Sequence, residues 1–593
     1  MKATALSATR RLTIALAVIA LAATSTRAAD VLGHVPDTAL AVVVVNNVEK
    51  GSDKIDQLAK KLQLPPPSVL NLITGEANIE KGLNRQGTVA AAMFAPPEGQ
   101  SNPRGVVLIP TTDYQTLIGQ LEPGKEDGGK TPVVLQDKEM VAAKIGDYAA
   151  LTEPKDAKLL DELLAGKTSI ASGLGEMSKW LESQDAYALA TSGGIALATD
   201  KILEVMELAQ EQFEGLDEKQ AEMIKMAFGI YRDMFKAAKS ELAFAAAGVR
   251  GEDKGVHLTG RLAFKPGSKA AKYAASVKPL GQDLLAGLPD GKFIAAGGME
   301  VSGDMIEELY SWSGRMIKAV PGGKDLKDED LDKLMKLSAE SMEGFKSASF
   351  AMYAIEKDEP IYSSVVGLMR VEDSAKFTAN YEKSIAAMNE LAKNTKHPFL
   401  QEGTVAKTQI DGKPALELTM AMPETASPDD PIAGEILKKL FGDARSIKAY
   451  VVAIDDKTVA IGYVKPDAVK RAMKAAGGKG LGGNANIAKA AELLPEGCQL
   501  QSYLSPKGLI DMVIAVMPGV EFSPVPALLG DFPDTPPIGF GAKLSASGLE
   551  TDLVVPEETL EAIGGVIARQ RAASTGPREL AHDSFVEVVP ASR

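Results

Sequence analysis

The order of predicted elements between residues 289 and 387 constrains the fold of this chain more than any other feature. Apolar residues at helical spacing predict helices, and short apolar runs between turn residues predict strands. The elements follow as a turn and strand at 289–296, helices at 305–320 and 331–345, strands at 347–355 and 361–369, and a helix from Asp373. The order is therefore β-α-α-β-β-α.

Versions of this order are predicted three more times along the chain, the last with a proline-rich loop at 518–537 in place of its second helix. Units start near Pro36-Asp37, Gln184-Asp185, Pro289-Asp290 and Pro495-Glu496. A β-rich block separates the two units of each half, and a Lys-Pro-Asp or Pro-Lys-Asp helix start closes both blocks. Generic alternation of helices and strands can imitate such a repeat, but the recurring starts and the matched blocks favour a duplication. In the second block, Asp411-Gly412 between two apolar strands predicts a type I′ hairpin.

We therefore expect an α+β fold that is internally duplicated. Four β-α-α-β-β-α units form two halves, residues 29–285 and 286–568, with mainly antiparallel sheets packed by amphipathic helices. The residues that follow, 569–593, mix charged and small side chains without a period and are expected to form a flexible C-terminal tail.

The first 28 residues have the pattern of a signal peptide. Lys2, Arg10 and Arg11 precede an apolar run at residues 12–23, and small residues follow up to a cleavage position after Ala28. The run is shorter than the roughly 20 residues of a comfortable membrane-spanning helix, although an uncleaved anchor is an alternative. We expect export to the periplasm or cell envelope, or secretion, with no transmembrane segment after cleavage.

The charge of the chain limits its partners. The net charge is −14, and removal of the four signal cations Lys2, Arg10, Arg11 and Arg27 makes it −18. Such an acidic surface repels phosphate backbones, so nucleic acid is not an expected partner. Cys498 is the only cysteine, which excludes an intramolecular disulfide, and its apolar neighbours predict a buried thiol rather than a nucleophile.

No catalytic, cofactor or metal motif stands out. The histidines His34, His257, His397 and His582 lack metal-ligand spacing, and no Gly-x-Ser-x-Gly sequence occurs. The glycine-rich residues 478–483 follow a predicted helix rather than a strand, which is typical of a helix end and linker. The acidic residues 328–332 lack the glycine and glutamate of a calcium loop and indicate a helix start. We therefore expect no catalytic, cofactor or metal residues and a protein that is not an enzyme.

Methionines gather on the predicted helices of the second and third units. Methionine fills irregular cores, and that interpretation is favoured. The alternative is a deformable groove for a lipid or other apolar ligand. Its candidate residues are Met206, Met223, Met234, Met305, Met316 and Met335.

The start of the first unit, Val35-Pro36-Asp37-Thr38-Ala39, follows a signal peptide and leads into an apolar strand. With the strand ends at residues 111–114 and 146–149, it resembles large exported bacterial proteins of unknown function. The resemblance spans most of the mature chain. It implies an exported, repeat-built α+β protein and supplies no catalytic residues.

These observations predict an exported, non-enzymatic envelope or surface protein that acts by binding or scaffolding, with an envelope protein or an apolar ligand as partner. One alternative is a periplasmic carrier of a lipid or other apolar ligand. A second is a hydrolase whose site is assembled from scattered residues.

Overall fold

A computed structural model describes most of the chain. The described residues are 28–64, 69–100, 102–166, 168–211, 218–277, 283–301, 306, 327–355, 359–395, 403–421, 431–442, 445–516 and 529–574. The predicted signal peptide before Ala28 and the helix predicted at residues 305–320, apart from Ile306, lie outside this set.

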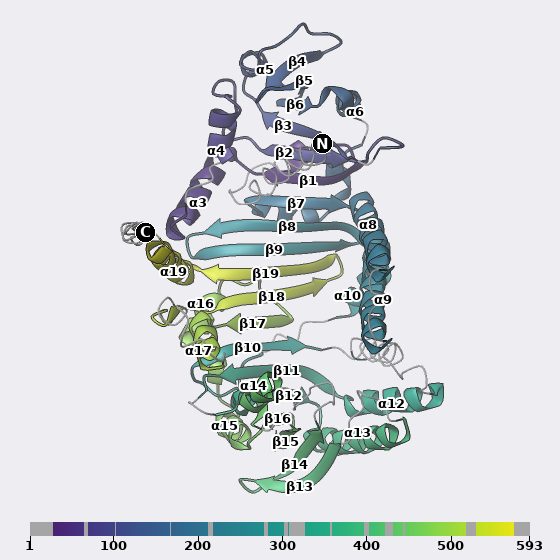
Figure 1. The fold of residues 1–593 in the computed structure, drawn as a ribbon, viewed down its shortest axis with the longest axis vertical. Helices are drawn as coiled ribbons and strands as arrows, with labels where there is room; N and C mark the ends of the chain where they lie inside the picture. Colours follow the sequence, from purple (N-terminus) through teal and green to yellow (C-terminus); the bar gives the residue numbers. More distant parts are fainter. Residues whose placement is uncertain are drawn as a thin grey trace, which may run out of the picture.

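In the described part of the chain, nineteen strands form one sheet (Figure 1). They are β1 Ala39–Val45, β2 Val89–Phe94, β3 Arg104–Pro110, β4 Lys130–Leu135, β5 Lys138–Ile145, β6 Tyr148–Thr152, β7 Ala186–Thr191, β8 Leu242–Glu252, β9 Gly255–Phe264, β10 Phe293–Glu300, β11 Phe345–Tyr353, β12 Val365–Val371, β13 Gly403–Ile410, β14 Lys413–Ala421, β15 Ser446–Asp455, β16 Thr458–Tyr463, β17 Leu500–Leu504, β18 Ile538–Ser545 and β19 Gly548–Pro556.

Every pairing in this sheet is antiparallel. From one edge to the other the strands run β13-β14-β15-β16-β12-β11-β10-β17-β18-β19-β9-β8-β7-β1-β2-β3-β6-β5-β4. The α+β class and the antiparallel pairing are therefore as predicted. The strands of the two predicted halves do not form separate sheets, because β9 pairs with β19 and joins them.

The β9–β19 junction lies in the middle of the sheet. Its register runs from Gly255 opposite Pro556 to Ala263 opposite Gly548, with Thr259 opposite Asp552 at the centre. Figure 1 shows the two strands at mid-height, between the strands of the first half above and those of the second half below. The junction therefore carries the backbone hydrogen bonding from one half into the other.

The helices flank the strands. They are α2 Ala28–Gly33, α3 Val48–Lys61, α4 Val69–Asn71, α5 Tyr114–Ile118, α6 Lys158–Ala165, α7 Met177–Ser183, α8 Ser192–Glu211, α9 Glu218–Glu241, α10 Lys269–Ser276, α12 Asp328–Ser341, α13 Ser374–Thr395, α14 Pro431–Phe441, α15 Asp467–Ala475, α16 Ala485–Ala491, α17 Pro506–Val516 and α19 Glu557–Ser574. In Figure 1, α3, α19, α16 and α17 lie to the left of the strands and α8, α9, α12 and α13 to the right. The acidic residues 328–332 form the first turn of α12, as predicted.

Local sequence explains several of these elements. The solid apolar strand β1 pairs with β2 on one side and β7 on the other, and Val42, Val44 and Val45 are fully buried. Asp411 and Gly412 have φ of 47° and 81°, the positive values that a type I′ turn requires, so the predicted hairpin is present.

Two large hydrophobic clusters form the core. One draws its residues from positions 31–263 and includes Trp180 and Tyr187; the other draws from positions 285–554 and includes Tyr353 and Tyr503. Each cluster therefore stays within one predicted half, to within a single residue at the boundary. The sheet is continuous across the two halves, but the main apolar clusters are not.

The structure differs from the sequence prediction at three places. Residues Ile361–Ser364 form a short 3₁₀ helix before β12, because Ser363 and Ser364 donate hydroxyl hydrogen bonds to the carbonyls of Pro360 and Ile361. The glycine-rich Gly480–Gly483 is a packed 3₁₀ helix rather than a linker, with Leu481 fully buried.

The third difference is at the C-terminus. Helix α19 continues to Ser574, six residues into the predicted tail. Arg571 of its last turn donates a hydrogen bond to the carbonyl of Gln63, which ties this turn to the end of α3. Residues 575–593 lie outside the described part of the chain.

Candidate functional site

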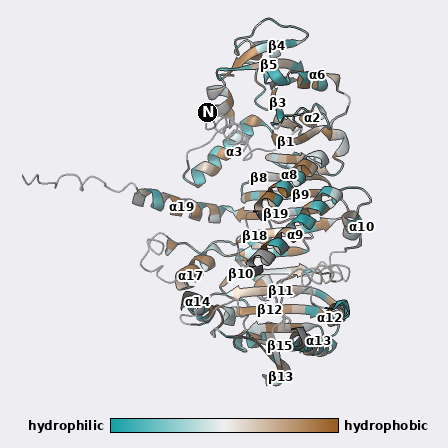
Figure 2. Cartoon of the chain, turned by 45° about the vertical axis from the view of Figure 1, so that its right-hand side comes forward, coloured by the Kyte–Doolittle hydropathy of each residue, from teal (hydrophilic) through white to brown (hydrophobic). Residues whose placement is uncertain are grey.

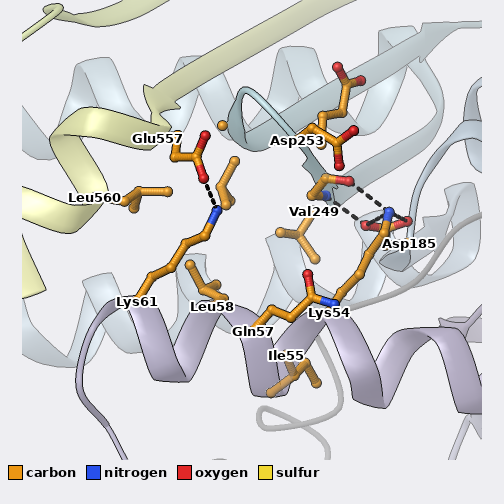
Figure 3. Close-up of a pocket in the computed structure, with 14 residues that line it drawn as sticks. Lys54, Ile55, Gln57, Leu58, Lys61, Asp185, Val249, Asp253, Glu557 and Leu560 are labelled. Carbon is orange, nitrogen blue, oxygen red and sulfur yellow. Dashed lines mark hydrogen bonds and ion pairs between the residues drawn. The ribbon is translucent and has the colours of Figure 1, made fainter.

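A pocket of about 400 Å³ opens where α3, α19 and the turn between β8 and β9 meet (Figure 3). Its walls mix charged and apolar side chains. The lining residues are Lys54, Ile55, Gln57, Leu58, Lys61, Asp185, Val249, Gly251, Glu252, Asp253, Gly255, Val256, Glu557 and Leu560. Because α19 belongs to the second half and the other elements to the first, the pocket exists only when the two halves are joined.

Asp185 organises one end of the pocket. This carboxylate is 1% exposed and lies just before β7. Both of its oxygens lie 3.1 Å from the Lys54 ammonium, and the Gly251 N–H donates to Oδ2 at 2.6 Å. Lys54 also donates to the Gly251 carbonyl at 2.7 Å. The buried charge therefore has the partners that it needs inside the protein.

Lys61 and Glu557 form the opposite end of the pocket. Their charged atoms are 2.5 Å apart, and their side chains are 31% and 39% exposed. Gly564 brings the two helices this close: a Cβ atom at that position would lie 2.0 Å from the Lys61 carbonyl oxygen. The ion pair therefore depends on the close crossing of α19 over the end of α3.

The charge balance of the pocket restricts what it can bind. Two lysines and four carboxylates line it, and each lysine already pairs with a carboxylate. Between these pairs, Ile55, Val249 and Val256 supply apolar surface. Glu252 pairs with Arg250 at 2.8 Å, and Asp253 adds a further negative charge, so the pocket suits a neutral polar or cationic molecule better than an anion.

The two ion pairs of the pocket should differ in their contribution to stability. We expect Lys54→Ala to lower the free energy of unfolding by about 1–3 kcal/mol, because it removes a partner of a buried carboxylate. The matched variant Lys61→Ala should cost less than about 1 kcal/mol, because that pair is partly solvated. Urea unfolding of both variants checks this, and equal losses would contradict it.

The predicted methionine groove is distributed over two helix pairs. Met206 on α8 is buried, Met234 on α9 is 58% exposed and Met335 on α12 is half-buried. Helix α8 packs against α9, and α12 packs against α13. Met223 lies on α9 with its side chain undescribed, and Met305 and Met316 lie outside the described residues. The described methionines therefore lie on two different helix pairs.

Exposed apolar side chains mark the α8–α9 pair instead. They are Leu197, Ile202, Val205 and Leu208 on α8, and Tyr231 and Met234 on α9, with exposed fractions from 37% to 63%. Figure 2 shows this pair over the middle of the sheet, with hydrophobic and hydrophilic residues mixed along it. Ile202, Val205 and Met206 follow one another at helical spacing, a pattern typical of a buried apolar stripe, but of these only Met206 is buried.

His257 is the one described histidine with a buried ionisable partner. It is 1% exposed in β9, and its Nδ1 donates to Asp552 of β19 at 3.0 Å. Arg250 Nη2 lies 3.7 Å from the same carboxylate oxygen. His34 packs its ring edge against Tyr148. His397 and His582 lie outside the described residues.

Sequence reasoning missed the His257–Asp552 pair. Asp552 is an acidic residue inside strand β19, and it is 2% exposed. An acid on the inward side of a strand is a signal that a buried partner is needed. The partner lies in β9, far away in the sequence, so that signal does not identify it.

Cys498 is buried, as predicted, just before β17. Burial raises the pKa of its thiol from 9.0 to about 11. At pH 8 the thiolate population is therefore roughly 100-fold lower than that of an ordinary cysteine. We expect native protein to react with iodoacetamide roughly 100-fold more slowly than urea-unfolded protein, as intact mass spectrometry can measure. Equal rates would contradict a buried thiol.

The same shift gives a direction for stability at high pH. The unfolded state loses the thiol proton near pH 9 and the folded state near pH 11. Folding stability should therefore fall between these values, and Cys498→Ala should reduce that fall.

Two further observations concern the described part of the chain. No group of three or more His, Cys, Asp or Glu side chains in it is arranged to hold a metal ion. None of its helices combines the length and the apolar character that crossing a membrane requires.

In comparisons with known proteins, no family model, no curated protein and no solved structure matches the chain.

Proposed function

We propose that this protein is an exported, non-enzymatic component of the cell envelope or surface that acts by binding or scaffolding. The observation that carries the proposal is the continuous antiparallel sheet of 19 strands that the described residues form. Neighbouring strands in such a sheet share backbone hydrogen bonds, so the whole length behaves as one connected platform. A long sheet with exposed side chains is suited to binding several partner molecules at fixed distances from one another.

Three other features agree with this role. The signal-like residues 1–28 and the acidic composition suit an exported protein that avoids nucleic acid. The α8–α9 pair exposes apolar side chains of the kind that mark interaction sites. The pocket at α3 and α19 holds its lysines in ion pairs, which leaves neither of them free to act as a base.

The two alternatives have less support. A carrier of an apolar ligand needs an enclosed apolar cavity, whereas the pocket is rich in charge and the exposed methionine lies on a helix surface. A hydrolase needs a nucleophile or activated water beside a base. The buried carboxylate of the pocket, Asp185, is instead bound to Lys54 and Gly251.

Native mass spectrometry of the mature protein, purified from its own host, tests the proposal. A scaffold should appear as a complex of defined stoichiometry with itself or with an envelope protein. A stoichiometric lipid adduct would instead support the carrier. A bare monomeric chain that turns over ester, peptide or glycoside substrates, with loss of turnover in Asp185→Asn, would support the hydrolase.

We further propose that the two halves, residues 29–285 and 286–568, are duplicates related by a pseudo-twofold axis. The first half orders its strands β4-β5-β6-β3-β2-β1-β7-β8-β9, and the second orders β14-β15-β16-β12-β11-β10-β17-β18-β19. If β13 is left out, two strands at the same position in these spatial orders are also at the same position in the chain order of their halves. For example, β4 corresponds to β14 and β9 to β19. The equivalent strands β9 and β19 then pair with each other, as a twofold axis between them requires.

Individual hydrogen bonds support the duplication. Long-range backbone bonds recur between equivalent positions of the two halves: Ile170 N to Val35 O and Leu481 N to Leu288 O; Asp185 N to Val249 O and Gln499 N to Ala542 O; Thr112 N to Gly82 O and Glu372 N to Gly344 O. Gly82 and Gly344 also share a positive φ, 75° and 77°. Generic alternation of helices and strands would not repeat these contacts.

A further inference from the structure

The two edges of the sheet differ in how their backbone groups are used. At one edge, β4 is covered by the segment that precedes it. Lys130 exchanges N–H and C=O hydrogen bonds with Asp127, the Pro132 carbonyl accepts from Gly124, and the Val134 N–H donates to Leu121. Pro132 has no N–H to offer. This edge is therefore closed to further strands.

At the other edge, no described strand or loop pairs with the outer side of β13. The two-residue turn at Asp411-Gly412 makes Ile410 and Lys413 a hydrogen-bonded pair, so the even-numbered residues of β13 bond to β14. The odd-numbered residues therefore direct N–H and C=O away from the sheet. Gly403 has both groups bonded to the Asn389 side chain, at 2.8 and 2.5 Å, which agrees with this alternation.

Beyond Gly403, the outward backbone groups have no partner in the part of the chain that the structure describes. These groups belong to Val405, Lys407 and Gln409. The Lys407 side chain turns toward α13, where it pairs with Glu382 at 3.1 Å. It therefore leaves the backbone edge clear. One strand with unpaired groups at a sheet edge is a template for another strand.

We propose that two copies of this chain dimerise by antiparallel pairing of β13 with β13 of the second copy. Each chain has one edge that can accept a strand, β13, and one edge that cannot, β4. The β13 edge of a second copy is therefore a matching partner for this edge. Pairing of the two open edges uses both of them, so association stops at a twofold dimer and cannot grow into a fibre. The interface needs only the backbone of β13 and does not depend on the proposed scaffold function.

Side chains select one register for this pairing. A twofold axis at Ala406 places Val405 opposite Lys407 of the other copy, and Thr404 opposite Thr408. Threonine pairs across strands are favourable. A twofold axis at Lys407 would place two lysines directly opposite each other, which is unfavourable. We therefore expect the register that is centred on Ala406.

Proline substitution tests the interface in the mature full-length chain. Lys407→Pro removes an outward N–H without touching the β13–β14 ladder, and Pro132 shows that this sheet accepts proline at an outward edge position. Two hydrogen bonds are lost per dimer, so the dissociation constant should rise roughly tenfold or more in sedimentation experiments. The matched control Lys407→Thr keeps the N–H and should dimerise like the natural protein.

Cysteine crosslinking tests the register. Ala406→Cys would place two thiols across the twofold axis at a non-hydrogen-bonded pair, about 4.5 Å apart at Cα, which a disulfide can bridge. The natural Cys498 is buried and should not interfere. We expect a covalent dimer from Ala406→Cys and none from the control Thr458→Cys on β16. A chain that stays monomeric at all concentrations, or a dimer that Lys407→Pro leaves unchanged in a folded protein, would overturn the proposal.

Discussion

Asp552→Ala is expected to lower the free energy of unfolding by about 3 kcal/mol. The carboxylate is 2% exposed and accepts the His257 Nδ1–H at 3.0 Å across the β9–β19 junction. Its removal leaves a buried imidazole N–H without an acceptor and takes away a carboxylate 3.7 Å from Arg250, which keeps its ion pair with Glu252 at 2.8 Å. Because the pair joins the two halves, the loss should appear as a lower urea midpoint of the whole chain.

A solvent-exposed ion pair across the same boundary provides the control. Lys254 and Glu492 lie 3.5 Å apart with side chains 73% and 66% exposed. Lys254→Ala should therefore change stability by less than about 1 kcal/mol. The double variant His257→Leu/Asp552→Leu should lose less than the sum of the single variants, because it leaves no unpaired polar group. An Asp552→Ala protein as stable as Lys254→Ala would contradict the buried pair.

Gly194→Ala is the second substitution with a large expected effect. Gly194 lies in the first turn of α8, where the helix crosses β1, and a Cβ there would be 1.9 Å from the Leu40 carbonyl oxygen. Neither the helix nor the central strand can move without disturbing the core. We expect a loss of about 3 kcal/mol, as for overpacked cores, measurable by thermal or urea unfolding.

The neighbouring glycine is the matched control. A Cβ at Gly193 would meet its nearest atom at 3.7 Å, an ordinary contact, so Gly193→Ala should be nearly neutral. The proposed duplication adds a second test. Gly508 occupies the corresponding turn of α17, and a Cβ there would lie 2.5 Å from the Phe293 carbonyl oxygen. Gly508→Ala should therefore destabilise as well; an effect at Gly194 alone would count against equivalent roles.

The capping contacts at these two helix starts support that comparison. The Gly194 N–H donates to the Thr191 hydroxyl at 3.3 Å, and the Gly508 N–H donates to the Ser505 hydroxyl at 3.1 Å. In each case a hydroxyl side chain three residues before the glycine holds the first turn of the helix. This arrangement is a common local N-terminal motif. Its occurrence against the first strand of each half is what the duplication predicts.

The sequence alone determined most of the local elements. The unbroken apolar run of β1, the Asp411-Gly412 turn and the acidic start of α12 all depend on interactions between residues close together in the chain. Hydrophobic period and turn chemistry report such interactions directly. The single cysteine likewise excluded an internal disulfide without any structure.

Local sequence patterns gave wrong predictions where the environment of a side chain depends on contacts with residues far away in the sequence. Val205 continues an apolar stripe on α8, but it is 63% exposed. Ile361 and its neighbours resemble a strand, but serine hydroxyls turn them into a 3₁₀ helix. Composition and period give the average environment of a residue. They do not give the neighbour that covers it.

Only the tertiary structure decided how the strands are ordered and where the pocket lies. Pairing of β9 with β19 brings His257 to Asp552, and the crossing of α19 over α3 brings Lys61 to Glu557. Each contact joins segments separated by hundreds of residues, and many antiparallel partners would satisfy the same alternation of side chains. The packing of the whole sheet makes the choice, because the observed arrangement pairs the interior strands, covers the β4 edge and brings His257 to Asp552.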